Sequence, residues 1–192
     1  TAAGNHAAAR KHLADLVSGT RIGAFAYDEH RGIAAPAQIA MTATPSGDGF
    51  VLNGEKRLVF GAAEAGFMVV AARAAGQAGD AQGLVLLLVD PRAAGITMTP
   101  FRTQDGRSAA HVRFDKVGVA GADVLAKDAH DLIEKLISDA ILVLAAEAVG
   151  AMTALLRITG AYATTRKQFG VAIGTFQTVA HRLADMKIAH AK

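Results

Sequence analysis

The sequence has no cysteine among its 192 residues. Without thiols the chain can form no disulfide, no thiolate nucleophile and no cysteine-ligated zinc site. Strong charge of either sign is also missing, because 20 Lys and Arg residues against 17 Asp and Glu residues leave a net charge of +3. The basic residues are scattered and are not interleaved with aromatic residues, so we expect no nucleic-acid partner. The absence of cysteine agrees with a cytoplasmic location, which we predict.

Long apolar runs are absent as well. The run from Leu84 to Val89 is among the longest, whereas a membrane-spanning helix needs about 20 residues. The first residues do not combine a charged start with an apolar segment, so no secretory signal is expected. Because 52% of the residues are hydrophobic and 19% are charged, we predict a folded protein with no membrane partner.

Sequence motifs of several common sites are missing. Neither G-x-G-x-x-G nor H-E-x-x-H occurs, which excludes a Rossmann dinucleotide site and a zincin site. Residues 49–56 (GFVLNGEK) resemble a phosphate loop, but Glu55 occupies the lysine position, and a hairpin strand is the better interpretation. Asp28, Glu29 and His30 are consecutive and point in different directions, so we predict no metal site.

The period of the hydrophobic pattern changes twice along the chain. Residues 4–17 have helical spacing that stops at Ser18 and Gly19. From Arg21 to about Phe114 the period is two, in short runs that are separated by turn residues such as 45–49 (PSGDG). Short strands without intervening helices predict an antiparallel barrel or sandwich.

After Asp128 the period becomes 3.6, which predicts a helix of roughly 35 residues. The pattern breaks at 170–174, and Thr175 is a candidate cap for a second helix that packs antiparallel to the first. The predicted fold class is therefore α+β, an antiparallel β-barrel or sandwich followed by the start of a C-terminal helical bundle. We assign 1–20 to the tail of an N-terminal helical domain, 21–126 to a middle β-domain and 127–192 to the first two helices of a truncated C-terminal domain.

The corner between these two helices, residues 166–177 (RKQFGVAIGTFQ), concentrates groups that suit a nucleotide. Arg166 is a permanent guanidinium for phosphates, the amides of Gln168 and Gln177 can bond base edges, and aromatic rings can stack. The alternative is a packed helix corner in which Phe169 and Phe176 fill the core and Arg166 is solvated. Chemistry alone leaves both interpretations open.

The segment YATTRKQFGVAIGTFQTVAHRLADM resembles the most specific signature of acyl-CoA dehydrogenases. Upstream, GTRIGAFAYDE, VLNGEKRLVFGAAEAGFMVVAAR and FRTQDGRSAAHVRFDKVGV are similar to strands of that family's β-domain, in the same order. The resemblance implies an FAD-dependent oxidoreductase component that desaturates an acyl-CoA thioester at its α,β bond. It also implies transfer of electrons to an electron-transfer flavoprotein, and a homo- or hetero-oligomer, either a dimer or a tetramer.

The resemblance further implies site residues. Family positions that contact the ADP part of FAD across a subunit interface correspond to Arg166, Gln168, Phe169 and Gln177. It implies a catalytic carboxylate on the C-terminal side of Lys192, so no catalytic residue is assigned within this sequence.

Two positions depart from the family pattern. A Thr-Glu-Pro segment that holds the flavin ring is replaced by Asp28, Glu29 and His30, and a hydroxyl near flavin N5 is replaced by Phe60. Asp28 would oppose the negative charge of reduced flavin, and Phe60 cannot donate a hydrogen bond.

Loops such as YDEHRGIAA make the sequence similar to the small subunit of two-component, pimeloyl-CoA-type dehydrogenases. A non-catalytic partner subunit, and a same-fold flavin monooxygenase or oxidase, therefore remain open as alternatives. Glu147, in an apolar stretch, is better explained by pairing with a basic residue than as a displaced base. His111 and His181 are given no role.

Overall fold

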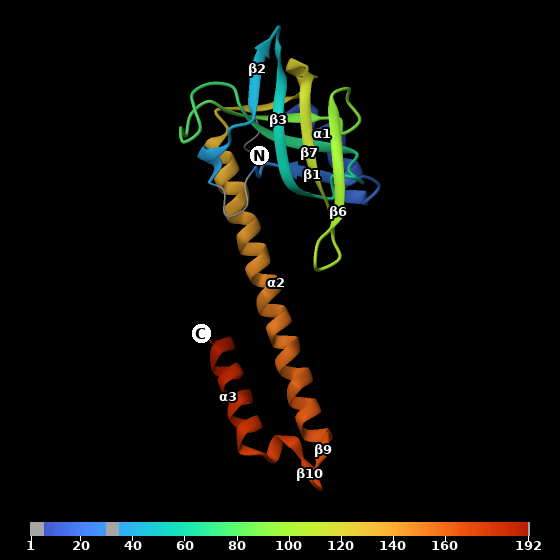
Figure 1. Cartoon of the computed structure of the whole chain (residues 1–192), viewed down its shortest axis with the longest axis vertical. Coiled ribbons are helices and arrows are strands. Elements are labelled where there is room, and N and C mark those ends of the chain that lie inside the picture. Colours follow the sequence, from blue (N-terminus) through green and yellow to red (C-terminus); the bar gives the residue numbers. More distant parts are fainter. Residues whose placement is uncertain (1–5, 30–34, 192) are drawn as a thin grey trace. The chain divides into compact units, whose positions relative to one another are not determined.

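A computed structural model describes residues 6–29 and 35–191 of the chain. These residues form two compact units, Thr1–Lys135 and Leu136–Lys192. The long helix α2 (His130–Thr165) begins in the first unit and continues through the second (Figure 1).

The first unit is built on one eight-stranded sheet. The order of neighbouring strands is β6-β7-β3-β2-β4-β5-β8, and β1 pairs with β4. The strands are β1 (Gly23–Ala26), β2 (Thr42–Ser46), β3 (Gly49–Phe60), β4 (Phe67–Arg73), β5 (Leu84–Val89), β6 (Ile96–Arg102), β7 (Ser108–Val119) and β8 (Val124–Lys127). β2 meets β4 at a single residue pair, Thr42 with Arg73, where the sheet turns a corner and becomes sandwich-like rather than a closed barrel.

The core lies between the two halves of this folded sheet. Buried side chains from β3 and β7 share one hydrophobic cluster with side chains from β4 and β5. Alternation explains this arrangement, because successive side chains of a strand point to opposite faces. The core members that are least accessible to solvent include Leu52, Met68, Val70, Leu87, Val112 and Phe114.

The predicted α+β class is confirmed, and the expectation of an antiparallel sheet needs one correction. β4 pairs in parallel with β1 over four residues and with β2 at one residue, so the sheet is mixed. β6 is an edge strand that contains Pro100, and β8 has only four residues. Within the described part of 21–114 the one helical element is the short 3-10 turn η1 (Pro36–Gln38).

The hairpin between β2 and β3 packs tightly against the end of β7, and we expect Gly49→Ala to destabilise the chain. A Cβ atom at Gly49 would lie 1.9 Å from the carbonyl oxygen of Val119. Overpacking of this kind costs about 1 to 3 kcal/mol of unfolding free energy. Gly118→Ala is the matched control, because a Cβ there meets nothing within 4 Å. Equal urea midpoints for the two variants would contradict this packing.

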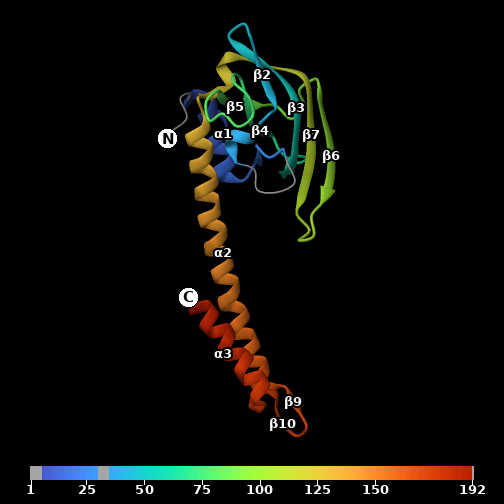
Figure 2. The same cartoon turned by 60° about the vertical axis from the view of Figure 1, so that its left-hand side comes forward.

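The helices follow the predicted periodicity. α1 (His6–Ser18) ends before Gly19, whose φ of 72° suits the left-handed position after a helix. α3 (Gln177–Ala191) runs back along α2 in both views (Figures 1 and 2), and Thr153 Oγ1 lies 2.8 Å from His190 Nε2. The prediction that Thr175 caps α3 is wrong, because its hydroxyl donates to the carbonyl of Ala172 and α3 begins two residues later.

α2 is long and apolar enough to cross a membrane, judged by length and composition alone. The short unbroken apolar runs in the sequence predicted no membrane-spanning helix. In α2 a few polar residues interrupt a mainly apolar helix, so its mean hydropathy is high although its unbroken runs are short. Core helices of soluble bundles meet the same criteria. In the second unit α2 leaves large apolar side chains exposed, among them Ile141, Leu142, Val143, Leu144, Leu155 and Ile158. Because monomeric soluble proteins rarely expose this much apolar surface, these side chains are typical of a helix that packs against further parts of a protein.

Candidate functional site

The corner between α2 and α3 is a short hairpin that is closed by backbone hydrogen bonds. β9 (Lys167–Gln168) pairs antiparallel with β10 (Val171–Ala172), and the 3-10 turn η3 (Ile173–Thr175) leads into α3. The backbone N–H of Ile173 donates to the carbonyl of Arg166 at 2.9 Å. The N–H of Arg166 donates to the carbonyl of Tyr162 at 2.8 Å, which continues the helical pattern into the corner.

The structure brings the four predicted ADP-contacting residues to this one corner. Arg166 directly follows α2, Gln168 is in β9, Phe169 is at the tip of the hairpin, and Gln177 is the first residue of α3. All four side chains are exposed. Their contact with a nucleotide stays a prediction.

Phe169 shows that the hairpin tip is not a packed core within this chain. Its side chain is 94% exposed, and its φ of 51° is in the left-handed region that non-glycine residues rarely adopt. The ring contacts only the edge of Phe176 among the aromatic rings described, with 6.2 Å between centroids. A strained, exposed aromatic residue is typical of a binding position.

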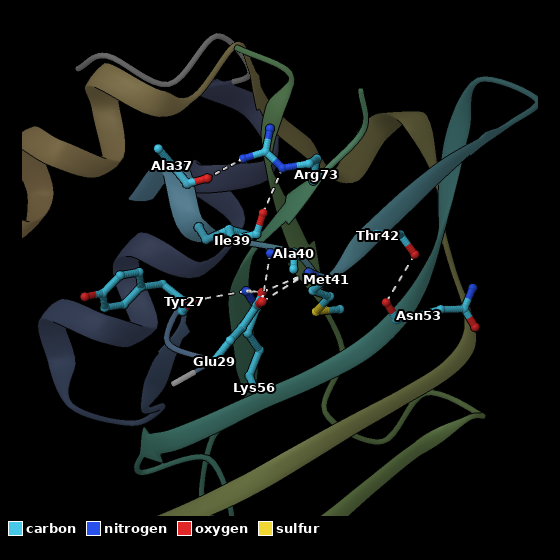
Figure 3. A network of polar contacts seen from close by, with 10 residues as sticks. All are labelled: Tyr27, Glu29, Ala37, Ile39, Ala40, Met41, Thr42, Asn53, Lys56 and Arg73. Carbon is cyan, nitrogen blue, oxygen red and sulfur yellow. Dashed lines mark hydrogen bonds and ion pairs between the residues drawn. The ribbon is translucent and has the colours of Figure 1, made fainter. Parts of the chain in front are cut away.

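A second polar site lies inside the first unit. Lys56 is completely buried on β3, and its Nζ lies 2.6 Å from Glu29 Oε1 (Figure 3). The same ammonium donates to the carbonyl of Tyr27 at 3.0 Å. Glu29 also accepts hydrogen bonds from the backbone N–H groups of Ala40 and Met41. The carboxylate is thus used for an ion pair and two backbone bonds.

Sequence reasoning missed this pair. Glu29 had been considered only as a flavin-segment residue and as one of three possible metal ligands, of which His30 lies outside the described residues. No group of three metal-ligating side chains occurs in the part of the chain that the structure describes. A signal was present, because strict alternation from Leu52 places Lys56 on the buried face. A lysine at a core position requires a buried acceptor.

Burial lowers the pKa of Lys56 to about 8, although the Glu29 carboxylate acts in the opposite direction. Between this value and the ordinary pKa of 10.5, the unfolded chain binds more protons than the folded chain. We therefore expect the unfolding free energy contributed by Lys56 to increase as pH rises through this window. Urea unfolding of wild type and Lys56→Met at about pH 7 and about pH 10 measures it. A wild-type-minus-variant difference that falls at the higher pH would contradict the assignment.

Arg73 anchors the loops beside this pair. Its guanidinium is 5% exposed and donates to five backbone carbonyls at 2.8 to 3.4 Å. These acceptors come from the segment before β2 and from the loop between β4 and β5, namely Ala37, Ile39, Ala75, Asp80 and Gln82. One side chain at the end of β4 therefore fixes two loops.

Asp28 and Phe60, the two positions that depart from the family pattern for the flavin ring, are both attached to β3. The carbonyl of Asp28 accepts a hydrogen bond at 2.7 Å from the N–H of Arg57 on β3. Phe60, at the end of the same strand, is 48% exposed. Leu58 lies between them with a φ of 50°, and its N–H donates to His111 Nδ1. The side chains of Phe60 and Leu58 present an apolar surface here.

Comparison with known proteins establishes the family. The acyl-CoA dehydrogenase middle-domain model matches residues 24–117, and the C-terminal-domain model matches residues 131–191. The chain therefore belongs to the acyl-CoA dehydrogenase family. The match to both domains in collinear order confirms the resemblance that the sequence motifs indicated.

Individual relatives agree with this assignment. A probable acyl-CoA dehydrogenase of Bacillus subtilis, YngJ, is 32% identical over 91% of this chain and 47% of its own length. Benzylmalonyl-CoA dehydrogenase of Aromatoleum aromaticum is 34% identical over 88% of this chain and 45% of its own length. A solved acyl-CoA dehydrogenase from Geobacillus kaustophilus gives a TM-score of 0.88 at 29% identity, covering 99% of this chain and 52% of that one. The chain spans about half the length of these proteins.

Proposed function

We propose that this chain is part of an FAD-dependent acyl-CoA dehydrogenase, an oxidoreductase that desaturates an acyl-CoA thioester between its α and β carbons. The observation that carries the proposal is the match of both family domains along one chain, with the 166–177 corner inside the second. The proposed substrate is an acyl-CoA, and the proposed electron acceptor is an electron-transfer flavoprotein. We further propose a cytoplasmic oligomer, with neither nucleic acid nor a membrane as a partner.

The helix corner supplies a donor set that fits the ADP half of FAD. Arg166 is exposed and would bond the pyrophosphate, while Gln168 and Gln177 would bond polar edges and Phe169 would supply an aromatic face. A solved structure similar to this chain is the FAD complex of PigA, at 27% identity and a TM-score of 0.84. When bound, FAD would act as the two-electron acceptor. The residues of this chain would bind and orient it.

The segment that is proposed to face the flavin ring fits less well. Phe60 offers no hydrogen-bond donor, and the Asp28 side chain offers negative charge where the reduced ring would also be negative. No catalytic base is assigned to this chain. Glu147 is exposed on α2. Its side chain is therefore not in an apolar environment within the second unit, and we do not assign it as a catalytic base.

Asp28 and Phe60 favour a second candidate function, a non-catalytic subunit that supplies ADP contacts to its partner. The similarity to pimeloyl-CoA-type small subunits stays a prediction that agrees with this candidate. A flavin monooxygenase or oxidase of the same fold is a third possibility. It differs from the other two by reacting without acyl-CoA.

Flavin stoichiometry tests the leading proposal. The full-length protein, purified with the product of the neighbouring gene, should carry FAD, measured by absorbance per chain. The 192-residue chain alone should bind no stoichiometric FAD, because it spans about half the length of its relatives and also carries Phe60 and Asp28 at the positions proposed to face the ring. If the isolated chain is yellow on purification and carries one flavin per chain, this expectation is overturned. A full-length assembly that binds no FAD under any condition would contradict the proposed function itself.

A further inference from the structure

α1 is attached to the rest of the first unit through few buried side chains. Among the α1 side chains that the structure describes, only Ala8 and His12 are buried, and they lie one helical turn apart on the same face. The larger apolar side chains of the helix, Leu13, Leu16 and Val17, are between 42% and 81% exposed. His12 is therefore the one large buried side chain in this described set.

The imidazole of His12 packs on the ring of Phe67, the first residue of β4. The two ring centroids are 4.5 Å apart and the angle between the ring planes is 29°, so the rings stack. Phe67 is itself buried, and a Cβ atom at Gly23 of β1 would lie 2.6 Å from its ring. The Phe67 ring thus contacts the β1 backbone as well as His12, and the histidine stacks on a ring that the sheet holds in place.

The contact between His12 and Arg21 requires a neutral imidazole. Arg21 Nη1 lies 3.4 Å from His12 Nδ1, in a partly buried position. A guanidinium has only donors, so Nδ1 must be the acceptor, and the proton of the neutral ring is then on Nε2. A second proton, on Nδ1, would replace this hydrogen bond by two donors that both carry positive charge. Protonation therefore removes one bond and adds repulsion where α1 meets the sheet.

The charged groups that surround the ring are Lys11, Asp15, Arg21, Asp90 and Asp123. Burial and the positive charge of Arg21 lower the pKa of His12 from its ordinary value of 6.5, and Lys11 contributes in the same direction. The carboxylates of Asp15 and Asp123 act in the opposite direction without cancelling this shift. Because a histidine on a released helix would keep the ordinary pKa, a fall in pH favours release.

We propose that His12 makes the attachment of α1 a pH-sensitive switch, in which the neutral ring holds the helix against β4 and protonation in mildly acidic solution releases it. The release is local, because the pairing of β4 with β1 and β5 does not involve α1. The inference does not rest on the proposed function, since none of these residues is placed against the cofactor or the substrate.

Amide hydrogen exchange of the full-length assembly tests the switch, at about pH 7.5 and about pH 5, with correction for the intrinsic exchange rate at each pH. In wild type, protection of residues 6–18 should fall at least about threefold at the lower pH, while β4 stays protected. His12→Phe cannot be protonated and keeps an aromatic ring on Phe67. Its α1 should therefore be equally protected at both pH values.

Two further variants locate the effect. Arg21→Gln removes the neighbouring positive charge, so protection of α1 should fall less than in wild type. His181→Phe, at an exposed position of α3, is the matched control and should keep the wild-type fall.

The outcomes are distinct. Equal protection of α1 at both pH values in wild type would overturn the inference, and so would an undiminished fall in His12→Phe, because another group would then be titrating. Loss of protection in β4 together with α1 would show global unfolding and would overturn it as well. If His12→Phe does not fold, Arg21→Gln decides, since a fall as large as that of wild type contradicts the role of this contact. None of these measurements involves flavin, so a negative result leaves the proposed function standing.

Discussion

In the full-length assembly, Arg166→Ala should weaken FAD binding about ten- to hundredfold while the fold stays intact, because a charge-assisted contact to a pyrophosphate contributes about 1.5 to 3 kcal/mol. The guanidinium is exposed at the end of α2, so its removal leaves no buried group unsatisfied. Arg166→Lys should recover only part of the affinity. Lysine keeps the charge but lacks the planar, two-pronged geometry of the guanidinium.

Titration of FAD into the apo-proteins of wild type, Arg166→Lys and Arg166→Ala measures this order of affinity, and thermal melts verify that each variant is folded. Arg157→Ala is a matched control on the same helix, where the side chain is also exposed and lies outside the corner. The packed-corner alternative predicts instead that Arg166→Ala changes stability by less than about 0.5 kcal/mol and leaves FAD binding unchanged. Equal FAD affinity across the series would remove Arg166 from the site.

Arg73→Met should lower the unfolding free energy by about 2 to 4 kcal/mol, the largest stability effect that we expect from a side chain in the first unit. The substitution removes donors from five carbonyls. Ala75, Asp80 and Gln82 are exposed, so water can replace part of the loss there. The substitution also removes the desolvation cost of a buried charge, which offsets a further part of the lost stability. The expected loss is therefore smaller than the sum of five charged hydrogen bonds.

Urea denaturation measures this loss. Arg92→Met provides the control, because Arg92 is exposed and its substitution should change the unfolding free energy by less than about 0.5 kcal/mol. Arg73→Lys should fall between wild type and Arg73→Met, since one ammonium cannot reach both loops. If Arg73→Met were as stable as the Arg92 variant, the carbonyl cluster would contribute nothing.

The change of period from two to 3.6 was enough to predict the fold class, because strand and helix side chains alternate with different spacings. The same pattern did not reveal the parallel pairing of β1 with β4, which depends on contacts between segments some forty residues apart. Pairing partners are set by tertiary packing, which a local pattern does not contain.

The residues of the candidate site could likewise be predicted only in part from the sequence. Arg166 and Gln177 could be predicted because they lie eleven residues apart in one contiguous signature. Glu29 and Lys56 lie 27 residues apart, and neither belongs to a motif that requires the other. Arg73 was also invisible, since its partners are backbone carbonyls that carry no sequence signal.

Anaerobic addition of saturated acyl-CoA thioesters of several chain lengths to the purified, FAD-containing full-length assembly tests the proposed dehydrogenase function most directly. At least one thioester should bleach the visible flavin absorbance and yield the corresponding α,β-unsaturated thioester, while free coenzyme A should not. Flavin that stays oxidised with every thioester, yet is reduced by a substrate without coenzyme A, would contradict the proposed function.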